Sequence, residues 1–236
     1  MKVTYYNHSG FSVETENKVL IFDYYSQGGR FDFFDPKDYL GKDIVFFVSH
    51  NHDDHFDTRI FLWEGKVTYV ISNDIKLDSD FQGEVLFVKP HETYFFQGVN
   101  IETLQSNDEG VAFIVEVDGK TIYHAGDLNW WHWNGESQVF NDDIAKSYHT
   151  EIQRIIGKKV DVAFIPADLR LEDKYSWATD YFMEKVGASA VFPMHFWGRF
   201  DVCKMLKEKN YGDKVMDITK ANEGFCLTDL GSPSPL

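Results

Sequence analysis

The chain has little cysteine and no long apolar run. Its 236 residues include only 2 cysteines and no Cys-x-x-Cys motif, which excludes a disulfide framework and a cysteine-only zinc module. No run approaches the ~20 apolar residues that a membrane-spanning helix needs. The opening MKVTYYNHSGF is polar by its fourth position and builds no apolar core of a signal peptide. We therefore expect a soluble protein of the reducing cytoplasm, without a membrane partner.

Basic residues are also scarce. The chain has 23 lysines and arginines against 38 aspartates and glutamates, giving a formal net charge of −15. Such a surface repels a phosphate backbone, so we expect no nucleic-acid partner. The 43% hydrophobic share, with 21 phenylalanines, is sufficient for a core and argues against disorder. An acidic protein can still hold a small anionic substrate through metal ions, which directs attention to the 9 histidines.

Short apolar segments predict a fold rich in strands. Residues 2–24 have the pattern of a meander, broken at Ser9-Gly10 and around Asn17. The apolar run 44–48 ends abruptly in polar residues, which is typical of a central strand covered on both faces. Similar runs lie at 67–72, 85–88, 111–117, 121–123, 160–165 and 190–192.

Helical patterns follow in the second half of the chain. Asp142 is positioned to cap a helix with an apolar residue at every fourth position: Ile144, Tyr148, Ile152 and Ile156. Two further helices are expected at 176–187 and 201–212. Helices covering a sheet that is buried on both sides predict a layered α/β sandwich. We expect a single domain over residues 1–230, followed by a frayed tail at 231–236.

Histidine and aspartate are concentrated directly after the strand at 44–48. His50 and His52 are two positions apart, so in an extended segment their imidazoles project to one side and can share a cation. Asp54 and His55 add a carboxylate and a third imidazole just beyond. Imidazole suits zinc and iron, whereas carboxylate suits harder cations. This density of ligands predicts a metal site in preference to a solvated polar loop.

Two later strand ends carry matching ligand types. Asp127 follows Gly126, where a small residue permits close approach of backbone, and His195 follows an apolar strand. Taken singly, Asp127 could cap a turn and His195 could be a core histidine. Open α/β folds usually build sites at the carboxyl ends of strands, so we predict both residues as ligands of the same centre.

These residues resemble a known family. His50-x-His52-x-Asp54-His55 is similar to the H-x-H-x-D-H signature of the metallo-β-lactamase superfamily, and Asp127 and His195 match its later ligand positions in the same order. The opening 7–11, NHSGF, resembles the branch that contains L-ascorbate-6-phosphate lactonase. The resemblance extends over almost the whole chain. It implies a four-layer αββα sandwich with the metal centre at one edge, between two sheets.

The resemblance also implies one or two divalent metal ions, with zinc expected first and manganese or iron as alternatives. Its ligand sets are His50 and His52 for site 1, Asp54, His55 and His195 for site 2, and Asp127 as the bridge. Two such cations lower the pKa of a shared water and polarise a substrate oxygen. Asp54, beside that water, is the predicted catalytic residue that orients it and takes its proton.

One position departs from the family pattern. The family usually has a third site 1 histidine before a Gly-Val-x-Phe strand, and Ser106 stands in that place here. Losing this imidazole weakens site 1. Asp108 is a candidate substitute ligand, which would favour manganese, iron or magnesium over zinc. Because site 2 keeps its full set, an enzyme with a single metal ion is an alternative.

The residues after Asp127 are candidates for substrate binding. Trp130, Trp131 and Trp133 either form apolar walls at the mouth of the site or fold back on the sheet edge. If this loop covers the metals, His132 is placed to bind substrate or to supply the missing ligand. Two arginines either face an anionic substrate group or form ordinary ion pairs: Arg170 and Arg199.

The remaining histidines are assigned to other roles. His124 is expected to be structural, because it faces away from Asp127 in an extended strand. His91 is expected in an exposed turn and His149 on a solvated helix face. His8 either borders the site or belongs to a hairpin.

The leading hypothesis for the function is a metal-dependent hydrolase that acts on a small ester, lactone, amide or phosphoester. The alternative is a non-catalytic metal-binding module with a degraded site 1. A redox function is disfavoured, because the flavodiiron proteins that resemble this pattern carry glutamate at the place of His52 and need a flavin domain.

Overall fold

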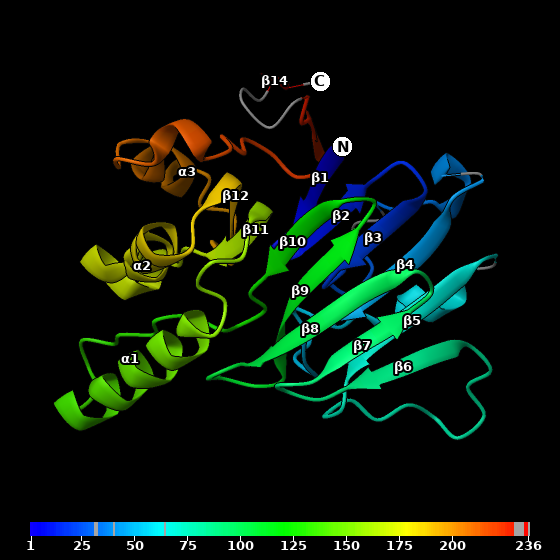
Figure 1. Ribbon diagram of the computed structural model, residues 1–236, viewed down its shortest axis with the longest axis horizontal. Coiled ribbons are helices and arrows are strands. Elements are labelled where there is room, and N and C mark those ends of the chain that lie inside the picture. Colours follow the sequence, from blue (N-terminus) through cyan, green and yellow to red (C-terminus); the bar gives the residue numbers. More distant parts are fainter. Residues whose placement is uncertain (31–32, 40, 64, 229–233, 236) are drawn as a thin grey trace.

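The computed structural model describes residues 1–30, 33–39, 41–63, 65–228 and 234–235. Two sheets face each other (Figure 1). The first contains β1 (Lys2–Asn7), β2 (Gly10–Glu14), β3 (Lys18–Phe22), β4 (Asp43–Val48), β5 (Val67–Ser72), β6 (Glu84–Val88), β13 (Glu223–Cys226) and β14 (Ser234–Pro235). The second contains β7 (Thr93–Phe96), β8 (Val99–Gln105), β9 (Val111–Val117), β10 (Lys120–His124), β11 (Val160–Pro166) and β12 (Ala188–Met194).

Both sheets combine antiparallel and parallel pairs. In the first, β1, β2 and β3 form the predicted antiparallel meander, and β3, β4, β5 and β6 run parallel. In the second, β7 to β10 are antiparallel, whereas β10, β11 and β12 are parallel. The carboxyl ends of β4, β10 and β12 carry the predicted ligand segments. Because β4 lies in the first sheet and β10 and β12 in the second, the packing of the two sheets brings these segments together.

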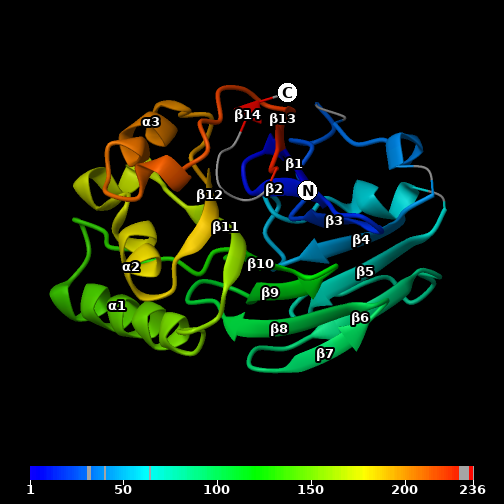
Figure 2. The same cartoon turned by 45° about the horizontal axis from the view of Figure 1, so that its top comes forward.

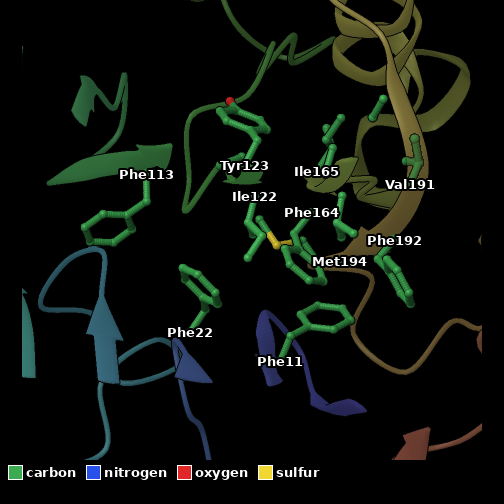
Figure 3. Packing of buried hydrophobic residues seen from close by; sticks show 14 of the residues in the cluster. Phe11, Phe22, Phe113, Ile122, Tyr123, Phe164, Ile165, Val191, Phe192 and Met194 are labelled. Carbon is green, nitrogen blue, oxygen red and sulfur yellow. The ribbon is translucent and has the colours of Figure 1, made fainter. Parts of the chain in front are cut away.

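The space between the sheets is filled by aromatic and aliphatic side chains. Phe47 lies 4.7 Å from Phe22 of the neighbouring strand and 5.3 Å from Phe113 of the opposite sheet, measured between ring centroids. Phe11 packs in the same way against Phe164, at 4.4 Å. Figure 3 shows the rings of Phe11, Phe22, Phe113 and Phe164 between the sheets. Burying a side chain of this size stabilises the fold by roughly 1.5–3 kcal/mol, so this interface is a major source of stability.

The other face of β4 explains why its sequence is continuously apolar. Ile44 and Phe46 point away from the opposite sheet into a second cluster of buried residues. That cluster is closed by Phe34, Ile60 and Trp63, which lie in and beside the short 3₁₀ segments η1 (Pro36–Tyr39) and η2 (Thr58–Leu62). The predicted two-sheet sandwich is confirmed, and in the described part of the chain its layer on this side consists of 3₁₀ turns and loops.

The opposite outer layer is helical. It comprises α1 (Gln138–Gln153), α2 (Trp177–Lys185) and α3 (Asp201–Lys207). Figure 2 shows all three on the side of β11 and β12, away from the first sheet. The predicted helix at 176–187 is confirmed, with Ser176 before its first residue and Gly187 after its end. The helix predicted at 201–212 ends earlier, at Lys207, and a separate 3₁₀ turn, η4 (Gly212–Lys214), follows.

The predicted start of the first helix is wrong. Ser137, not Asp142, is the N-cap, because its extended backbone lets the side chain accept a hydrogen bond from Phe140 N. Asp142 lies inside α1 and accepts a hydrogen bond from the Gln138 amide. Ile156 lies beyond the helix and is exposed, so the apolar pattern continued one turn further than the helix.

Most predicted strands are present with shifts of one or two residues, and four strands of the described chain were missed: β7, β8, β13 and β14. In the predicted tail, residues 231–233 and 236 lie outside the described residues, and Ser234–Pro235 pairs with β13. Among the described residues, none of the helices has the length and apolar character required to cross a membrane.

Candidate metal centre

The predicted ligand segments meet at one edge of the sandwich. The residues after β4 supply His50, His52, Asp54 and His55, the turn after β10 supplies Asp127, and the residue after β12 is His195. His50, His55, Asp127 and His195 are all buried, whereas the His52 side chain is 41% exposed. The candidate ligands at this edge are therefore mostly closed off from solvent, and solvent reaches them on the side of His52.

Two glycines allow this close approach. Gly110 has a φ of +68°, and a Cβ atom there would lie 1.9 Å from the Ser49 carbonyl oxygen. Gly126 has a φ of +52°, and its Cβ would lie 2.8 Å from that of Ser49. The second sheet can therefore reach the end of β4, where Val111 N donates to Ser49 O at 3.0 Å. This confirms the close backbone approach that was predicted at Gly126.

We expect Gly110→Ala to destabilise the protein and to weaken metal binding. The new Cβ would push the Ser49 backbone, and with it His50, out of place. The loss in unfolding free energy should exceed ~1 kcal/mol, as measured by denaturant titration. Gly119→Ala is the matched control, because Gly119 has a similar φ of +71° but a methyl group there would meet nothing within 4 Å. Equal losses in the two variants would contradict the role assigned to this close contact.

The donor atoms form three overlapping groups. In each group the donor atoms lie within 4.8 Å of one another. The groups are His8, Asp54, His55 and His195; His50, His55 and Asp127; and His52, Asp108 and Asp127. Asp127 connects the set: its Oδ1 lies 3.2 Å from His55 Nε2 and 3.5 Å from His195 Nε2, and its Oδ2 lies 3.6 Å from His50 Nε2.

The chemistry of this donor set fits divalent metal ions. Three buried polar atoms at its centre make no hydrogen bond with any of the described residues: His8 Nε2, His55 Nε2 and Asp127 Oδ1. Buried polar atoms are normally paired, and leaving one unpaired costs ~1–3 kcal/mol. A cation held by these atoms would satisfy all three.

The protonation of the cluster favours cation binding at several positions. Burial lowers the pKa of both His8 and His50 to about 4, so both imidazoles are neutral at pH 7 and able to act as ligands. Burial alone would raise the pKa of Asp127, but His55, His195 and His50 hold it well below its usual range. The pKa of His55 is raised, because Asp127 and Asp23 outweigh the effect of burial.

Two further carboxylates orient the ligand histidines. Asp23, fully buried, accepts from His55 Nδ1 at 2.8 Å and from Ser49 N at 2.8 Å. Asp168, also buried, accepts from His195 Nδ1 at 3.0 Å. These contacts leave Nε2 of each histidine directed at Asp127. Such outer partners fix the ring orientation and tautomer of metal-binding histidines.

Asp108 lies where the missing histidine would be needed. Ser106 is buried, and its hydroxyl accepts a hydrogen bond from Asp108 N at 3.2 Å. This turn places the Asp108 carboxylate in the group with His52 and Asp127. Burial and the neighbouring Asp127 raise the pKa of Asp108. A cation beside it would relieve this repulsion.

A cavity of about 320 Å³ opens over the cluster. Its lining includes the predicted ligands His52, Asp54, Asp108, Asp127 and His195. Of the predicted substrate-binding residues, Trp131 and Arg170 are in the lining, together with Trp133.

The structure does not bring the other three predicted substrate-binding residues to this cavity, which corrects their expected position. Trp130 packs on Trp177 and His149, because successive residues of the loop point to opposite sides. His132 likewise packs against Trp177, at 5.0 Å between ring centroids. Arg199 pairs with Asp201 at the exposed start of α3.

The other histidines fall into distinct environments. His8 borders the site: its Nε2 lies 3.1 Å from Asp54 Oδ2, and its ring lies 4.3 Å from that of His195. His124 is structural as predicted, since it is buried and contacts the Ser9 carbonyl oxygen at 3.0 Å. His91 is exposed and contacts Glu151. The prediction of a solvated His149 is wrong, because its ring stacks on Tyr181.

Comparison with known proteins agrees with this arrangement. A family model described as a beta-lactamase superfamily domain matches residues 2–195. A metal-dependent hydrolase of Bacillus velezensis is 25% identical over 219 residues, which cover 83% of this chain and 85% of that protein. YtkL of Bacillus subtilis, also named a metal-dependent hydrolase, is 25% identical over 219 residues, covering 83% and 86%.

Solved structures show the same fold. Igni18, a metallo hydrolase of Ignicoccus hospitalis, has a TM-score of 0.58 at 20% identity, covering 82% of each chain. YhfI of Bacillus subtilis, a metallo-beta-lactamase fold protein, has a TM-score of 0.56 at 15% identity, covering 83% of this chain and 86% of its own. With the family model matched over most of its length, the chain belongs to the metallo-β-lactamase superfamily.

Proposed function

We propose that the protein is a metal-dependent hydrolase that cleaves a small ester, lactone, amide or phosphoester with one or two divalent ions. The observation that carries the proposal is the buried Asp127 carboxylate, which lies among three histidines at the base of an open cavity. The names of the two Bacillus relatives support the same class of activity.

The residues divide into two candidate ligand sets around Asp127. Asp54, His55 and His195, with His8, make one set, and His50, His52 and Asp108 make the other. When bound, the ions act as Lewis acids on the substrate and provide a water of lowered pKa. Imidazole and carboxylate donors suit zinc, manganese and iron, with Asp108 favouring the harder ions.

Asp54 is placed to handle the attacking water. It lines the cavity, and its side chain is 22% exposed, so both substrate and water can reach it. Burial would raise its pKa, but the neighbouring imidazoles of His8 and His55 lower it well below the usual range. An ionised carboxylate only accepts hydrogen bonds, so Asp54 can orient the water and take its proton.

Trp131 forms a fixed wall of the cavity. Trp131 lies 5.3 Å from the ring of His195, and its Nε1 donates to the Asp127 carbonyl oxygen at 2.9 Å. The wall is thereby fixed to the ligand-bearing turn itself.

Turnover should depend on metal and on Asp54. We expect chelation to abolish hydrolysis of a panel of esters, lactones, amides and phosphodiesters, and zinc, manganese or iron to restore it. Asp54→Asn should lower kcat by about 10²–10⁴-fold. The exposed neighbour Asp53, which belongs to none of the ligand groups, provides the control variant Asp53→Asn. Bound metal without turnover on the panel, with unfolding on chelation, would favour the non-catalytic module.

A further inference from the structure

The cavity over the metal cluster has an aromatic wall that is rigidly held. Trp131 and Trp133 are parallel, with an interplanar angle of 3° and ring centroids 5.9 Å apart. Asn141 of α1 accepts from Trp133 N and donates to Trp133 O, each at 2.9 Å, which ties the loop to the helix. Phe140 and Ile144 of the same helix extend the apolar lining. The wall is therefore formed before any substrate arrives.

Arg170 is the only lysine or arginine among the described residues that line the cavity, and it already has partners. Its Nε donates to both carboxylate oxygens of the buried Asp168, at 3.0 and 2.8 Å. The guanidinium carbon lies 5.7 Å from the Trp133 ring centroid and 5.2 Å from that of Trp197. The charge of Arg170 is thus balanced by Asp168, and the two indole rings flank its guanidinium while the side chain stays 53% exposed.

The other charged groups of the lining also disfavour an anion. Asp54, Asp108 and Asp127 all face the cavity, and their charges are the ones that would balance bound cations. An anionic substituent away from the reacting bond would meet these carboxylates and the indole rings. The Arg170 N–H groups that do not contact Asp168 remain able to donate to an anion, but the charge of Arg170 is already balanced by the buried Asp168 carboxylate.

We infer that the cavity selects an uncharged ester, lactone or amide that carries a flat apolar group, and that Arg170 holds Trp133 and Trp197 in place instead of receiving an anion. This rests on the proposed hydrolase function and narrows its substrate class. Of the two alternatives that the sequence left open for Arg170, the inference takes the ion pair and not the anionic substrate group. It departs from the phosphorylated lactone that the resemblance to the lactonase branch suggests.

A matched pair of non-hydrolysable ketones tests the inference by binding alone. 4-Phenyl-2-butanone and 4-oxopentanoate share a methyl ketone and differ in a terminal phenyl ring or carboxylate. In NMR titrations of the metal-loaded protein, we expect the phenyl ketone to bind at least ~10-fold more tightly, because its ring buries apolar surface. Equal affinity, preference for the carboxylate or no binding of the phenyl ketone overturns the inference.

Two variants separate the roles of the wall and of Arg170. Trp133→Ala should lower the affinity for the phenyl ketone about tenfold, because the phenyl ring packs on the indole face. The affinity for 4-oxopentanoate should change by no more than about twofold. Trp177→Ala is the control, because Trp177 packs on Trp130 and His132 outside this cavity. Arg170→Gln should also weaken only the phenyl ketone. Selective loss of 4-oxopentanoate binding in Arg170→Gln would show that Arg170 receives anions, and would overturn the inference.

The ketone experiment also separates this inference from the proposed function. A protein that prefers the phenyl ketone but hydrolyses none of the panel retains the inference about the cavity and loses the proposed activity. A protein that hydrolyses esters but prefers 4-oxopentanoate loses only the inference.

Discussion

Replacing Asp127 by asparagine is expected to remove metal binding and turnover together. The two side chains have nearly the same shape, but only the carboxylate carries the charge that a cation between His50, His55 and His195 requires. Asp127 belongs to two of the three donor groups, and its Oδ1 also lies 3.5 Å from a histidine of the third. Changing it therefore affects both candidate metal positions, whereas changing a single histidine affects chiefly one.

The loss of metal affinity should exceed ~100-fold, because changing even the outer partners of ligands costs ~10–100-fold. The measurement is metal content per chain after dialysis, followed by titration with zinc and manganese. Asp161→Asn is the matched control: Asp161 is also buried, but it accepts from Thr121 N at the opposite end of β11. An Asp127→Asn protein that keeps its full metal content would refute the central position of this carboxylate.

The parts of the centre that could be predicted from sequence are those set by local geometry. His50 and His52 follow a strand that the sequence marks clearly, and Asp127 and His195 follow two more. The carboxyl ends of the parallel strands β10 and β12 meet at one edge of their sheet, so the convergence of Asp127 and His195 followed from the strand assignment. The convergence with β4 depends on the packing of the two sheets, which the family resemblance implied. The H-x-H-x-D-H spacing then indicated the metallo-β-lactamase superfamily.

The parts that could not be predicted depend on contacts between distant segments. Asp23 and Asp168 are ordinary acidic residues in sequence, and only the fold brings them to Nδ1 of His55 and His195. His8 has a φ of +54° after β1, and that turn directs its ring at the site. A signal for Asp23 existed, since it directly follows a buried strand, as the ligands do.

The loop after Asp127 was hard to predict for a different reason. Irregular backbone has no fixed period, so the sequence could not tell which of its tryptophans face the metal cluster. Trp131 and Trp133 do, whereas Trp130 and His132 face Trp177. Likewise, β8 was missed because polar residues alternate with its apolar ones, and β7 was missed because it has only 4 residues, none of them buried.

The second large effect is expected for the stability of the fold itself. Asp23 has no exposed surface, and it accepts hydrogen bonds from Ser49 N, the Ser49 hydroxyl and His55 Nδ1. Asp23→Ala leaves these donors buried without a partner, and removing one member of a buried charged pair costs ~3–5 kcal/mol. Denaturant titration of the metal-free protein should show a loss of this size in the free energy of unfolding.

Two comparisons distinguish this effect from the general cost of losing a carboxylate. Asp43 pairs with Lys18 and Lys66 at 3.3 and 3.6 Å with its side chain 44% exposed, so Asp43→Ala should cost less than ~1 kcal/mol. Asp23→Asn keeps an acceptor for Ser49 N and tolerates the φ of +41° at this position. Its loss of unfolding free energy should therefore lie between those of Asp23→Ala and Asp43→Ala. If Asp23→Ala were no more destabilising than Asp43→Ala, Asp23 would not be the residue that fixes His55 and the end of β4.

Since His55 is a candidate ligand held by this same contact, the Asp23 variants should also lose metal affinity, by ~10–100-fold.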